Sequence, residues 1–491
     1  MNVKAHEAGL AATATRLKRG QIGPVGLAAL AIGIMSPALG LFALWGPMQS
    51  SAGPMTPLVY LAAAMLALPT AISYAMLNAA APSAGAASTW LWRAVSPTAG
   101  YLIGLTMTTY FILAALAQPL LFALFFRDLL AFFGVPAAGL TTLLVAVPVI
   151  TIPVMWAAYT GAEASTRLAV ILMTIESVVV IALSLTILYD KSHVEGGINL
   201  TPFSPLAATH GFRGFWMAIL LGILAFCGFD VVSTAAEEAH APREHLPKAI
   251  ILTIVGITFF WMLNAWVFTL AIPHKLVVAY STQGLTAVTP LAQAYWGRGN
   301  ILVILTAITG ICAVYITGTL GASRILFALA RHGLLPRALA RLHTEQRVPR
   351  EALHVVFGIV LVGNIAAILI FRNGLVAFTW WANAMVFFAT LTFAAVNIAN
   401  ICYFRRVAPA RFRILPNLIV PIIGAASTAY VMYESFFVAL WNTDFLTGRS
   451  VVYFCVVLFV LFILIVWLVA RVSPQRLQGG APIGAQDDID Q

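Results

Sequence analysis

Two acidic residues stand in apolar stretches of this chain, where a charged side chain is costly. Glu176 lies about ten residues into the stretch 165–189, and Asp230 lies near the end of the stretch 214–236. Both stretches are long enough to cross a bilayer, and an ionisable group at that depth faces a polar cavity or another helix. Such a carboxylate can hold a cation or exchange a proton. The alternatives are a structural carboxylate for Glu176 and a helix cap for Asp230.

Glycine or proline interrupts two of the apolar stretches. The stretch 22–45 contains a glycine–proline segment at 33–40, and the stretch 214–236 contains Gly228 beside Asp230. Breaks at matching places of two halves are typical of inverted-repeat transporters, in which freed backbone groups bind the solute. A simple proline kink is the alternative for the first stretch. The candidate solute-binding residues at the two breaks are Gly33, Met35, Ser36, Ala38, Leu39, Gly40, Phe226, Cys227, Gly228, Phe229 and Asp230.

The first break is expected to offer backbone N–H groups to a solute, and the second is expected to offer backbone carbonyls. Pro37 has no N–H and suits the first position of a helix, so we expect it to begin the outer half of the first span. The N–H groups of Ala38, Leu39 and Gly40 would then face an anion such as a carboxylate. Freed carbonyls around 226–229 would hold an amine.

The elements that must position these residues are membrane helices. Of the 491 residues, 61% are hydrophobic and only 9% are charged, whereas a soluble domain has about 25% charged residues. The sequence therefore predicts an all-α polytopic membrane protein in a lipid bilayer, without a soluble domain. About twelve spans are expected, at 22–45, 56–80, 98–126, 138–159, 165–189, 214–236, 248–272, 300–329, 353–371, 375–403, 414–440 and 450–470.

The excess of positive charge is explained by topology. Most of the 27 lysines and arginines fall in the segments that share a side with the N-terminus. By the positive-inside rule, both termini are then cytoplasmic and the protein lies in the cell membrane. This placement argues against a nucleic-acid partner. Glu237 and Glu238 fall at the cytoplasmic end of their span, where we expect them to pair with basic side chains.

Other functional classes lack support in the sequence. The four cysteines all fall inside predicted spans, so a disulfide-linked partner subunit is not expected. No metal-ligand cluster, nucleophile elbow or phosphate-binding loop is present, and we therefore expect neither an enzyme nor a cofactor or metal. Residues 1–20 are polar and show no cleavage site of a signal peptide.

Five segments together resemble the amino acid–polyamine–organocation superfamily of secondary transporters. Each is weak alone, but they occur in the family's order and the likeness covers nearly the whole chain. They are 73–78 followed by 82–85, 97–104, 161–167, 226–250, and 322–324 followed by 330–336.

The resemblance implies a LeuT-like fold with a binding site near the membrane midplane. In that fold, spans 1–5 and 6–10 form inverted repeats, spans 1 and 6 are discontinuous, and two accessory helices follow. The expected organisation is a cytoplasmic segment 1–20, a transmembrane domain 21–472 and a disordered tail 473–491. Within the domain, the repeats would cover about 21–190 and 213–404, and the accessory helices about 413–471.

The resemblance also suggests roles for single residues. Phe226 occupies a gating position of the family, and Asp230 stands where a family glutamate takes part in gating. Glu176 stands where many relatives place a lysine, and we expect it to couple protons to transport. Gly318 on the eighth span would allow close approach of the solute. A sodium site is the weaker alternative to proton coupling, and its hydroxyl ligands would be Thr317 and Thr319.

Two departures from the family pattern bear on the solute. Met76 stands where the family commonly has a glutamate, and Pro37-Ala38-Leu39 replaces the usual glycine-rich sequence of the first break. The sequence nonetheless predicts a permease for a small amine-bearing solute, with an amino acid as the leading expectation. It would work by alternating access as a proton-coupled symporter. An amino acid or polyamine exchanger and a non-transporting solute receptor remain the alternatives.

Overall fold

The structure is a computed structural model. It describes residue 20 and residues 22–136, 139–160, 162–282, 286–343, 348–442 and 448–475. The expected N-terminal segment 1–20 and tail 473–491 lie almost entirely outside these residues. Gly161, the first residue of the resemblance segment 161–167, also lies outside them.

Twelve helical segments of the described residues are long and apolar enough to cross a membrane, which confirms the predicted number. Sheet structure in this part of the chain is limited to one bridge, between Ile22 and Ala239. The helices of the spans are, in order, α2 (Pro24–Met35) with α3 (Leu39–Phe42), α4 (Trp45–Ala52) with α5 (Thr56–Ala80), α7 (Pro97–Phe132), α8 (Leu140–Tyr159), α9 (Ala162–Ser192), α10 (Gly211–Phe226) with α11 (Val231–Thr234), α12 (Pro242–Ala271), α14 (Val288–Trp296) with α15 (Ile301–Arg331), α16 (Arg350–Phe371), α17 (Gly374–Arg406), α18 (Val420–Met432) with a π-helical turn at each end, and α20 (Ser450–Val472).

Several helices extend beyond the ends of the predicted spans. α7 continues to Phe132 rather than ending at 126, and α12 begins at Pro242 rather than at 248. Proline suits the first turn of a helix, which explains why both α7 and α12 start at one. One expectation was wrong in detail, because α3 begins at Leu39 and Pro37 lies in the preceding turn. The short helices α6 (Ala87–Ala94), α13 (His274–Thr282) and α19 (Ala439–Asn442) lie in connections.

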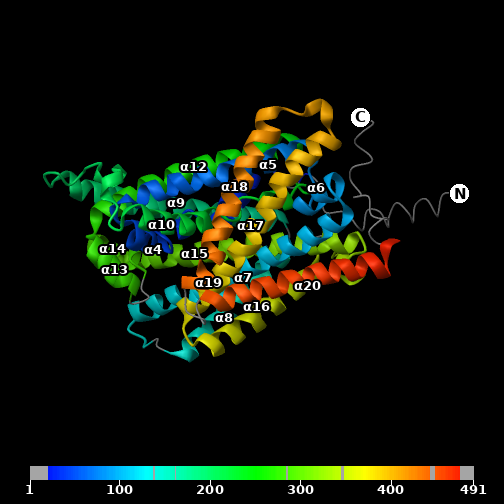
Figure 1. Cartoon of the computed structure of the whole chain (residues 1–491). Helices are drawn as coiled ribbons and strands as arrows, with labels where there is room; N and C mark the ends of the chain where they lie inside the picture. Colours follow the sequence, from blue (N-terminus) through cyan, green and yellow to red (C-terminus); the bar gives the residue numbers. More distant parts are fainter. Residues whose placement is uncertain are drawn as a thin grey trace.

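The long helices run beside one another as a single bundle (Figure 1). α7 packs against both α15 and α17, and α5 packs against α12. The broken first span lies deep in the bundle, where α2 contacts α9, α12 and α15. α11, which follows the second break, contacts α2, α12 and α15. Both breaks are therefore surrounded by protein, which is where unpaired backbone groups can be tolerated in a membrane.

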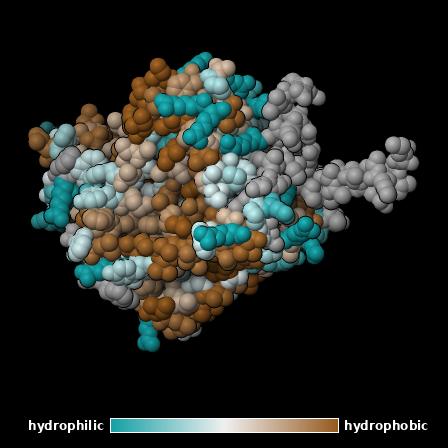
Figure 2. Space-filling model, turned by 45° about the vertical axis from the view of Figure 1, so that its right-hand side comes forward, coloured by the Kyte–Doolittle hydropathy of each residue, from teal (hydrophilic) through white to brown (hydrophobic). Residues whose placement is uncertain are grey.

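The outside of the bundle is apolar. Figure 2 shows hydrophobic residues over much of the face in view, with hydrophilic residues gathered in patches. On α20, Val457 is 67% exposed and Leu468 is 54% exposed. Such side chains would be unfavourable in water and suit contact with lipid tails, so the chain is a multi-pass membrane protein.

Because the number of spans is even, α2 begins and α20 ends on the same side of the membrane. We call this side the terminal side and the opposite side the distal side.

Candidate functional site

The first break (36–38) separates α2 from α3. Pro37 cannot donate a backbone hydrogen bond, and Ser36 has a positive φ of 50°, so the regular helix ends at Met35. In the described residues, the carbonyls of Gly33, Ile34 and Met35 accept no hydrogen bond. The break therefore leaves three acceptors unpaired deep in the protein.

Glu176 of α9 binds directly to the first break. Its Oε2 accepts hydrogen bonds from the Ser36 hydroxyl at 2.5 Å and from the Ala38 N–H at 3.1 Å. The Ser36 Oγ in turn accepts from the Leu39 N–H at 3.1 Å, and the Ser36 carbonyl accepts from the Gly40 N–H at 3.1 Å. The three N–H groups expected to hold an external anion are thus already bonded inside the protein.

In this structure the N–H groups expected to bind a solute carboxylate are bonded to protein atoms, and the expected position of that carboxylate stays a prediction. The start of α3 does meet a carboxyl group, but that group is the side chain of Glu176. Its other oxygen, Oε1, is buried and has no hydrogen-bond partner among the described residues. No lysine or arginine in this part of the chain forms an ion pair with Glu176. The carboxylate is held by two donors from the break alone.

The second break (227–230) separates α10 from α11. Gly228 has φ 114°, a conformation that side chains rarely adopt, and a Cβ there would lie 2.7 Å from a methyl carbon of Ile34. The carbonyls of Ala225, Phe226 and Cys227 accept no hydrogen bond from the described residues. Like the first break, this one exposes three unpaired acceptors.

Asp230 ends the second break and is fully buried. Its Oδ1 accepts a hydrogen bond from the Tyr110 hydroxyl at 3.1 Å, and its Oδ2 accepts one from the Tyr74 hydroxyl at 3.2 Å. Both oxygens are therefore satisfied by phenols from other spans. In the described part of the chain, no basic residue pairs with Asp230 either.

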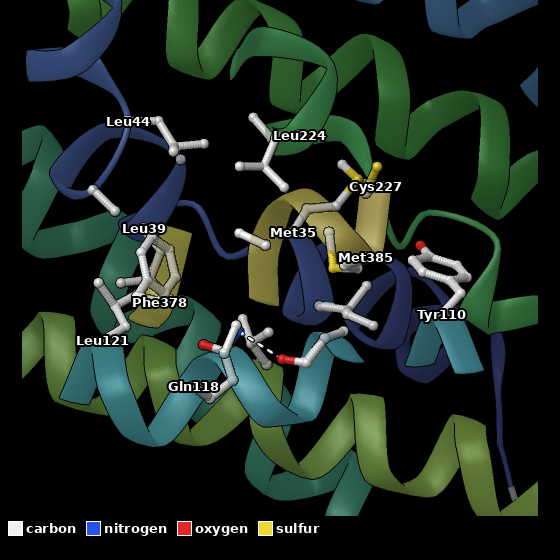
Figure 3. Close-up of a pocket in the computed structure, with 18 residues that line it drawn as sticks. Met35, Leu39, Leu44, Tyr110, Gln118, Leu121, Leu224, Cys227, Phe378 and Met385 are labelled. Carbon is white, nitrogen blue, oxygen red and sulfur yellow. Dashed lines mark hydrogen bonds between the residues drawn. The ribbon is translucent and has the colours of Figure 1, made fainter. Parts of the chain in front are cut away.

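A cavity of about 80 Å³ lies between the two breaks, α7, α15 and the first half of α17 (Figure 3). It is lined by Ile34, Met35, Leu39, Gly40, Ala43, Leu44, Tyr110, Ala114, Ala117, Gln118, Leu121, Leu224, Ala225, Cys227, Val314, Phe378, Ala382 and Met385. Most of these residues come from the distal halves of their spans. The walls are apolar except for Tyr110, Gln118 and Cys227.

The structure places four of the predicted solute-binding residues on this cavity, namely Met35, Leu39, Gly40 and Cys227. The others do not line it: Gly33, Ser36, Ala38, Phe226, Gly228, Phe229, Asp230 and Gly318. Asp230 lies one layer behind the wall, since it is bonded to Tyr110, which does line the cavity. The gating roles of Phe226 and Asp230 stay predictions.

Trp261 of α12 joins the two breaks. Its Nε1 donates a hydrogen bond to the Pro37 carbonyl at 3.0 Å, and its ring meets the ring of Phe226 edge-on, with centroids 5.2 Å apart. A Cβ on Gly40 would lie 2.2 Å from the Trp261 ring, so only glycine leaves room for the indole at that position. Trp261 thus contacts both the first break and the residue that precedes the second.

The eighth span carries two hydroxyls near its middle, and that of Thr317 lies 3.8 Å from where a Cβ on Gly33 of the first span would stand. Thr317 donates to the Ala313 carbonyl at 2.8 Å, and Thr319 donates to the Tyr315 carbonyl at 2.7 Å. These are ordinary bonds to the preceding turn of the helix. A Cβ on Gly318 would meet the α7 backbone at 3.8 Å, so this glycine faces a neighbouring helix rather than the cavity.

Two ion pairs lie on the terminal side of the bundle, one buried and one part-buried. Glu238 pairs with Arg324 at 2.5 Å and Glu237 pairs with Arg331 at 2.6 Å, which confirms that these acids pair with basic residues. The same segment bonds to the start of the first span, through Ile22 N–H to the Glu238 carbonyl at 3.1 Å. Beyond the end of α15, burial and the neighbouring Arg331 lower the pKa of His332 to about 4.

Sequence reasoning missed Tyr74, Tyr110, Gln118 and Trp261. A signal was available for part of this set. Residues 110, 114, 117, 118 and 121 follow the spacing of one helix face, and small alanines at 114 and 117 leave room beside the polar side chains. Polar residues on such a face of a membrane span indicate a cavity.

Comparison with known proteins identifies the family. The family model described as "Amino acid permease" matches residues 26–478. This chain belongs to the amino acid permease family. The predicted resemblance to the wider superfamily is thereby confirmed, and the permease belongs with transporters rather than enzymes.

Several curated relatives of the permease are transporters. It is 28% identical to the branched-chain amino acid permease BcaP of Bacillus subtilis (strain 168), over 68% of this chain and 72% of the relative. It is 25% identical to the methylthioribose transporter of the same organism, over 80% of this chain and 84% of the relative. It is 28% identical to cationic amino acid transporter 4 of Mus musculus, over 75% of this chain and 58% of that protein.

A solved structure shares the fold of the permease. The manganese transporter of Eremococcus coleocola, crystallised with an aromatic bis-isothiourea compound, superposes with a TM-score of 0.57 at 12% identity. The likeness covers 93% of this chain and 94% of that one. It confirms the LeuT-like fold and carries no information on the solute.

Proposed function

We propose that this permease is a proton-coupled symporter that moves an amino acid with an apolar side chain by alternating access. One observation carries the proposal. Four residues that line the cavity, Ile34, Met35, Ala225 and Cys227, have carbonyls that accept no hydrogen bond from the described residues. Carbonyls freed at broken membrane helices are the groups that coordinate a cation or an amine.

The rest of the cavity suits an apolar side chain. One water needs roughly 10–15 Å³ of such space, so about 80 Å³ accommodates several non-hydrogen atoms of a small solute. The walls carry no charged side chain, which disfavours a solute with a second charge, because an unpaired buried charge is costly. The name of the BcaP relative, a branched-chain amino acid permease, agrees with this class of solute.

Proton coupling would arise because Glu176 and the carboxylate of a solute compete for the same backbone N–H at the first break. An ionised Glu176 accepts the Ala38 N–H, which is the donor that a solute carboxylate would use. A protonated Glu176 is a weaker acceptor, so it releases this donor more readily to an anionic group. Proton binding then favours solute binding, and by linkage solute binding favours proton binding.

Alternating access requires the terminal side to open. The pairs Glu238–Arg324 and Glu237–Arg331 join the segment after α11 to α15, so both must part before solute can leave on that side. The terminal side would be the cytoplasm, because basic residues concentrate there. The protein would lie in the cell membrane with both termini inside.

Uptake by purified permease in proteoliposomes tests the proposal. Labelled apolar amino acids should accumulate when a pH gradient, acid outside, is imposed, and a proton ionophore should abolish the accumulation. Binding without any flux would support the receptor alternative. Flux only against preloaded solute would support an exchanger. Accumulation driven by a sodium gradient alone would support the alternative of a sodium site at Thr317 and Thr319.

A further inference from the structure

A second pocket lies on the terminal side of the bundle, outside the solute cavity. It has a volume of about 520 Å³ and is formed by the end of α5, the end of α17 and the connection from α17 to α18. These three helices pack against one another (Figure 1). Its walls include Met76 and Ala80 of α5, Phe404 of α17, and Arg411, Phe412 and Arg413 of the connection. We call it the basic pocket, because only the two arginines are charged among the described residues that line it.

The guanidinium groups of the basic pocket have no protein partner among the described residues. Arg411 and Arg413 are both exposed and form no ion pair there. Their backbone is fixed, since the Arg411 N–H donates to the Ala408 carbonyl at 3.0 Å and the Arg413 N–H donates to the Asn417 side-chain oxygen at 2.9 Å. The wall is thus held in place while both charges remain available to a ligand.

The helices that form the basic pocket carry no acid to neutralise these charges. α5 contains no aspartate or glutamate, and neither does the stretch 374–433, which covers α17 and α18. Arg405, at the end of α17, adds a third positive charge beside the pocket, because its guanidinium carbon lies 5.7 Å from the centre of the Phe412 ring. The elements that build the pocket therefore carry positive charge or none, and they suit an anionic ligand.

The surface next to the basic pocket is apolar and exposed. Ile414 and Leu415 follow Arg413 directly and are 63% and 64% exposed, and Ile422 on α18 is 53% exposed. In a bilayer, such side chains contact lipid tails. A ligand matches both surfaces when it joins an anionic head group to hydrocarbon chains, whereas a soluble anion would use the pocket alone.

We propose that the basic pocket binds the head group of an anionic phospholipid, whose phosphate contacts Arg411 and Arg413 and whose acyl chains lie along α18. Arginine suits this role because its planar guanidinium can donate two parallel hydrogen bonds to a phosphate. The terminal side is the basic side of the protein, and the cytoplasmic leaflet of a membrane carries the anionic lipids that basic clusters attract. The inference goes beyond the proposed transport function and does not depend on the identity of the solute.

Lipid binding to the purified permease tests this inference. We would titrate delipidated protein in a neutral detergent with dioleoylphosphatidylglycerol, which is anionic, and with dioleoylphosphatidylcholine, which has the same chains and no net charge. Native mass spectrometry counts the bound lipids, and a lipid that binds the folded state also raises the melting temperature. One arginine near a membrane surface strengthens the binding of an anionic lipid roughly 5-fold, so two should give phosphatidylglycerol an advantage of roughly 25-fold.

Removal of charge assigns this advantage to the basic pocket. The double variant Arg411→Gln/Arg413→Gln should lose most of the preference for phosphatidylglycerol and bind phosphatidylcholine as before. Arg337→Gln/Arg341→Gln is the matched control, because both arginines are exposed on the terminal side and do not line the pocket. It removes the same charge and should keep the preference. The melting temperature of each variant without lipid shows that it is folded.

A second pair of variants keeps both arginines. Met76 lines the basic pocket, so Met76→Glu places a carboxylate inside it. The carboxylate can pair with an arginine and repel a phosphate, and the preference for phosphatidylglycerol should be lost. Met76→Gln has nearly the same shape without the charge and should keep the preference.

Other outcomes overturn the inference. Equal binding of the two lipids by the wild type would refute it, and an equal loss of preference in the Arg337 and Arg341 variant would indicate general attraction to a basic surface. Inorganic phosphate, added at constant ionic strength, should leave phosphatidylglycerol bound, and displacement by phosphate would assign the pocket to a soluble anion. Solute is absent from these measurements, so a failure here leaves the proposed transport standing, and a failure of transport leaves this inference standing.

Discussion

Both breaks interrupt a membrane helix and leave three carbonyls unpaired among the described residues, but the carboxylate beside each break is bound by different groups. At the first break, the carboxylate of Glu176 bonds directly to the interrupted backbone, through the Ala38 N–H and the Ser36 hydroxyl. At the second, the carboxylate of Asp230 is held by the phenols of Tyr74 and Tyr110. Next to each break, three carbonyls accept no hydrogen bond from the described residues.

This difference suggests different roles for the two carboxylates, one in changing the bonding of a break and one in supporting the cavity wall. A change in the charge of Glu176 alters bonds to the backbone of the break itself. A change in Asp230 alters bonds to two tyrosines of other spans, one of which lines the cavity. We therefore expect Glu176 to control coupling and Asp230 to hold the cavity wall. Four substitutions test this comparison.

The largest effect is expected at the second break itself. Cys227 lines the cavity and has an ordinary backbone conformation, so Cys227→Trp should fill the solute space without straining the chain. Uptake in proteoliposomes should fall to the level of empty vesicles while the protein stays folded.

Cys402→Trp is the matched control, because Cys402 is half-buried on α17 and does not line the cavity. It should retain uptake. Normal transport by the Cys227 variant would place the solute elsewhere in the bundle.

Glu176→Gln should abolish accumulation but not exchange. Glutamine imitates the protonated acid, so the break can still release its N–H groups to a solute, but the amide cannot take up a proton and release it with the solute. We expect no concentration of solute under an imposed pH gradient, solute-for-solute exchange within a few-fold of wild type, and binding that varies little with pH. Accumulation equal to wild type would make Glu176 a structural residue.

Gly40→Ala should weaken the link between the breaks. The added methyl would lie 2.2 Å from the Trp261 ring and would displace the indole from the Pro37 carbonyl and Phe226. Overpacking of this kind costs about 1–3 kcal/mol, so both melting temperature and uptake should drop.

Gly33→Ala provides the comparison on the same span. A methyl there would make only ordinary contacts, with the nearest atoms 3.8 Å away. The two variants should differ clearly in both measurements, and equal behaviour would show that Trp261 readily finds another position.

The smallest effect is expected for Asp230→Asn. The amide replaces one of two acceptor oxygens, so one phenol must reverse its bond or lose it, at a cost of about 1–2 kcal/mol of stability. The melting temperature should fall, while accumulation under a pH gradient should persist. Loss of accumulation with exchange retained, as expected for Glu176→Gln, would transfer the coupling role to Asp230.

Much of the fold could be predicted because membrane helices are encoded locally. A helix in lipid must be apolar along its whole length and must satisfy its own backbone, so hydropathy alone located twelve spans. The breaks could also be predicted, because Pro37 and Gly228 mark the positions at which regular helical hydrogen bonding is interrupted. Even the depth of Glu176 followed from its position within a span.

The residues that line the site could not be predicted to the same degree. Which residues face a cavity depends on how each helix is rotated about its axis, and a nearly uniform apolar surface leaves little trace of that rotation in the sequence. For this reason Ala38 and Asp230 were expected at the solute site but do not line the cavity, whereas Gln118 lines it and was not predicted.

The sequence by itself thus determined the spans, their breaks and the presence of two buried carboxylates, because each depends on neighbouring residues only. Tertiary structure alone decided what each carboxylate bonds to. Glu176 meets Ser36 across 140 positions of the chain, and Asp230 meets Tyr74 across 156. Contacts at such separations arise from packing between helices, which local sequence does not encode.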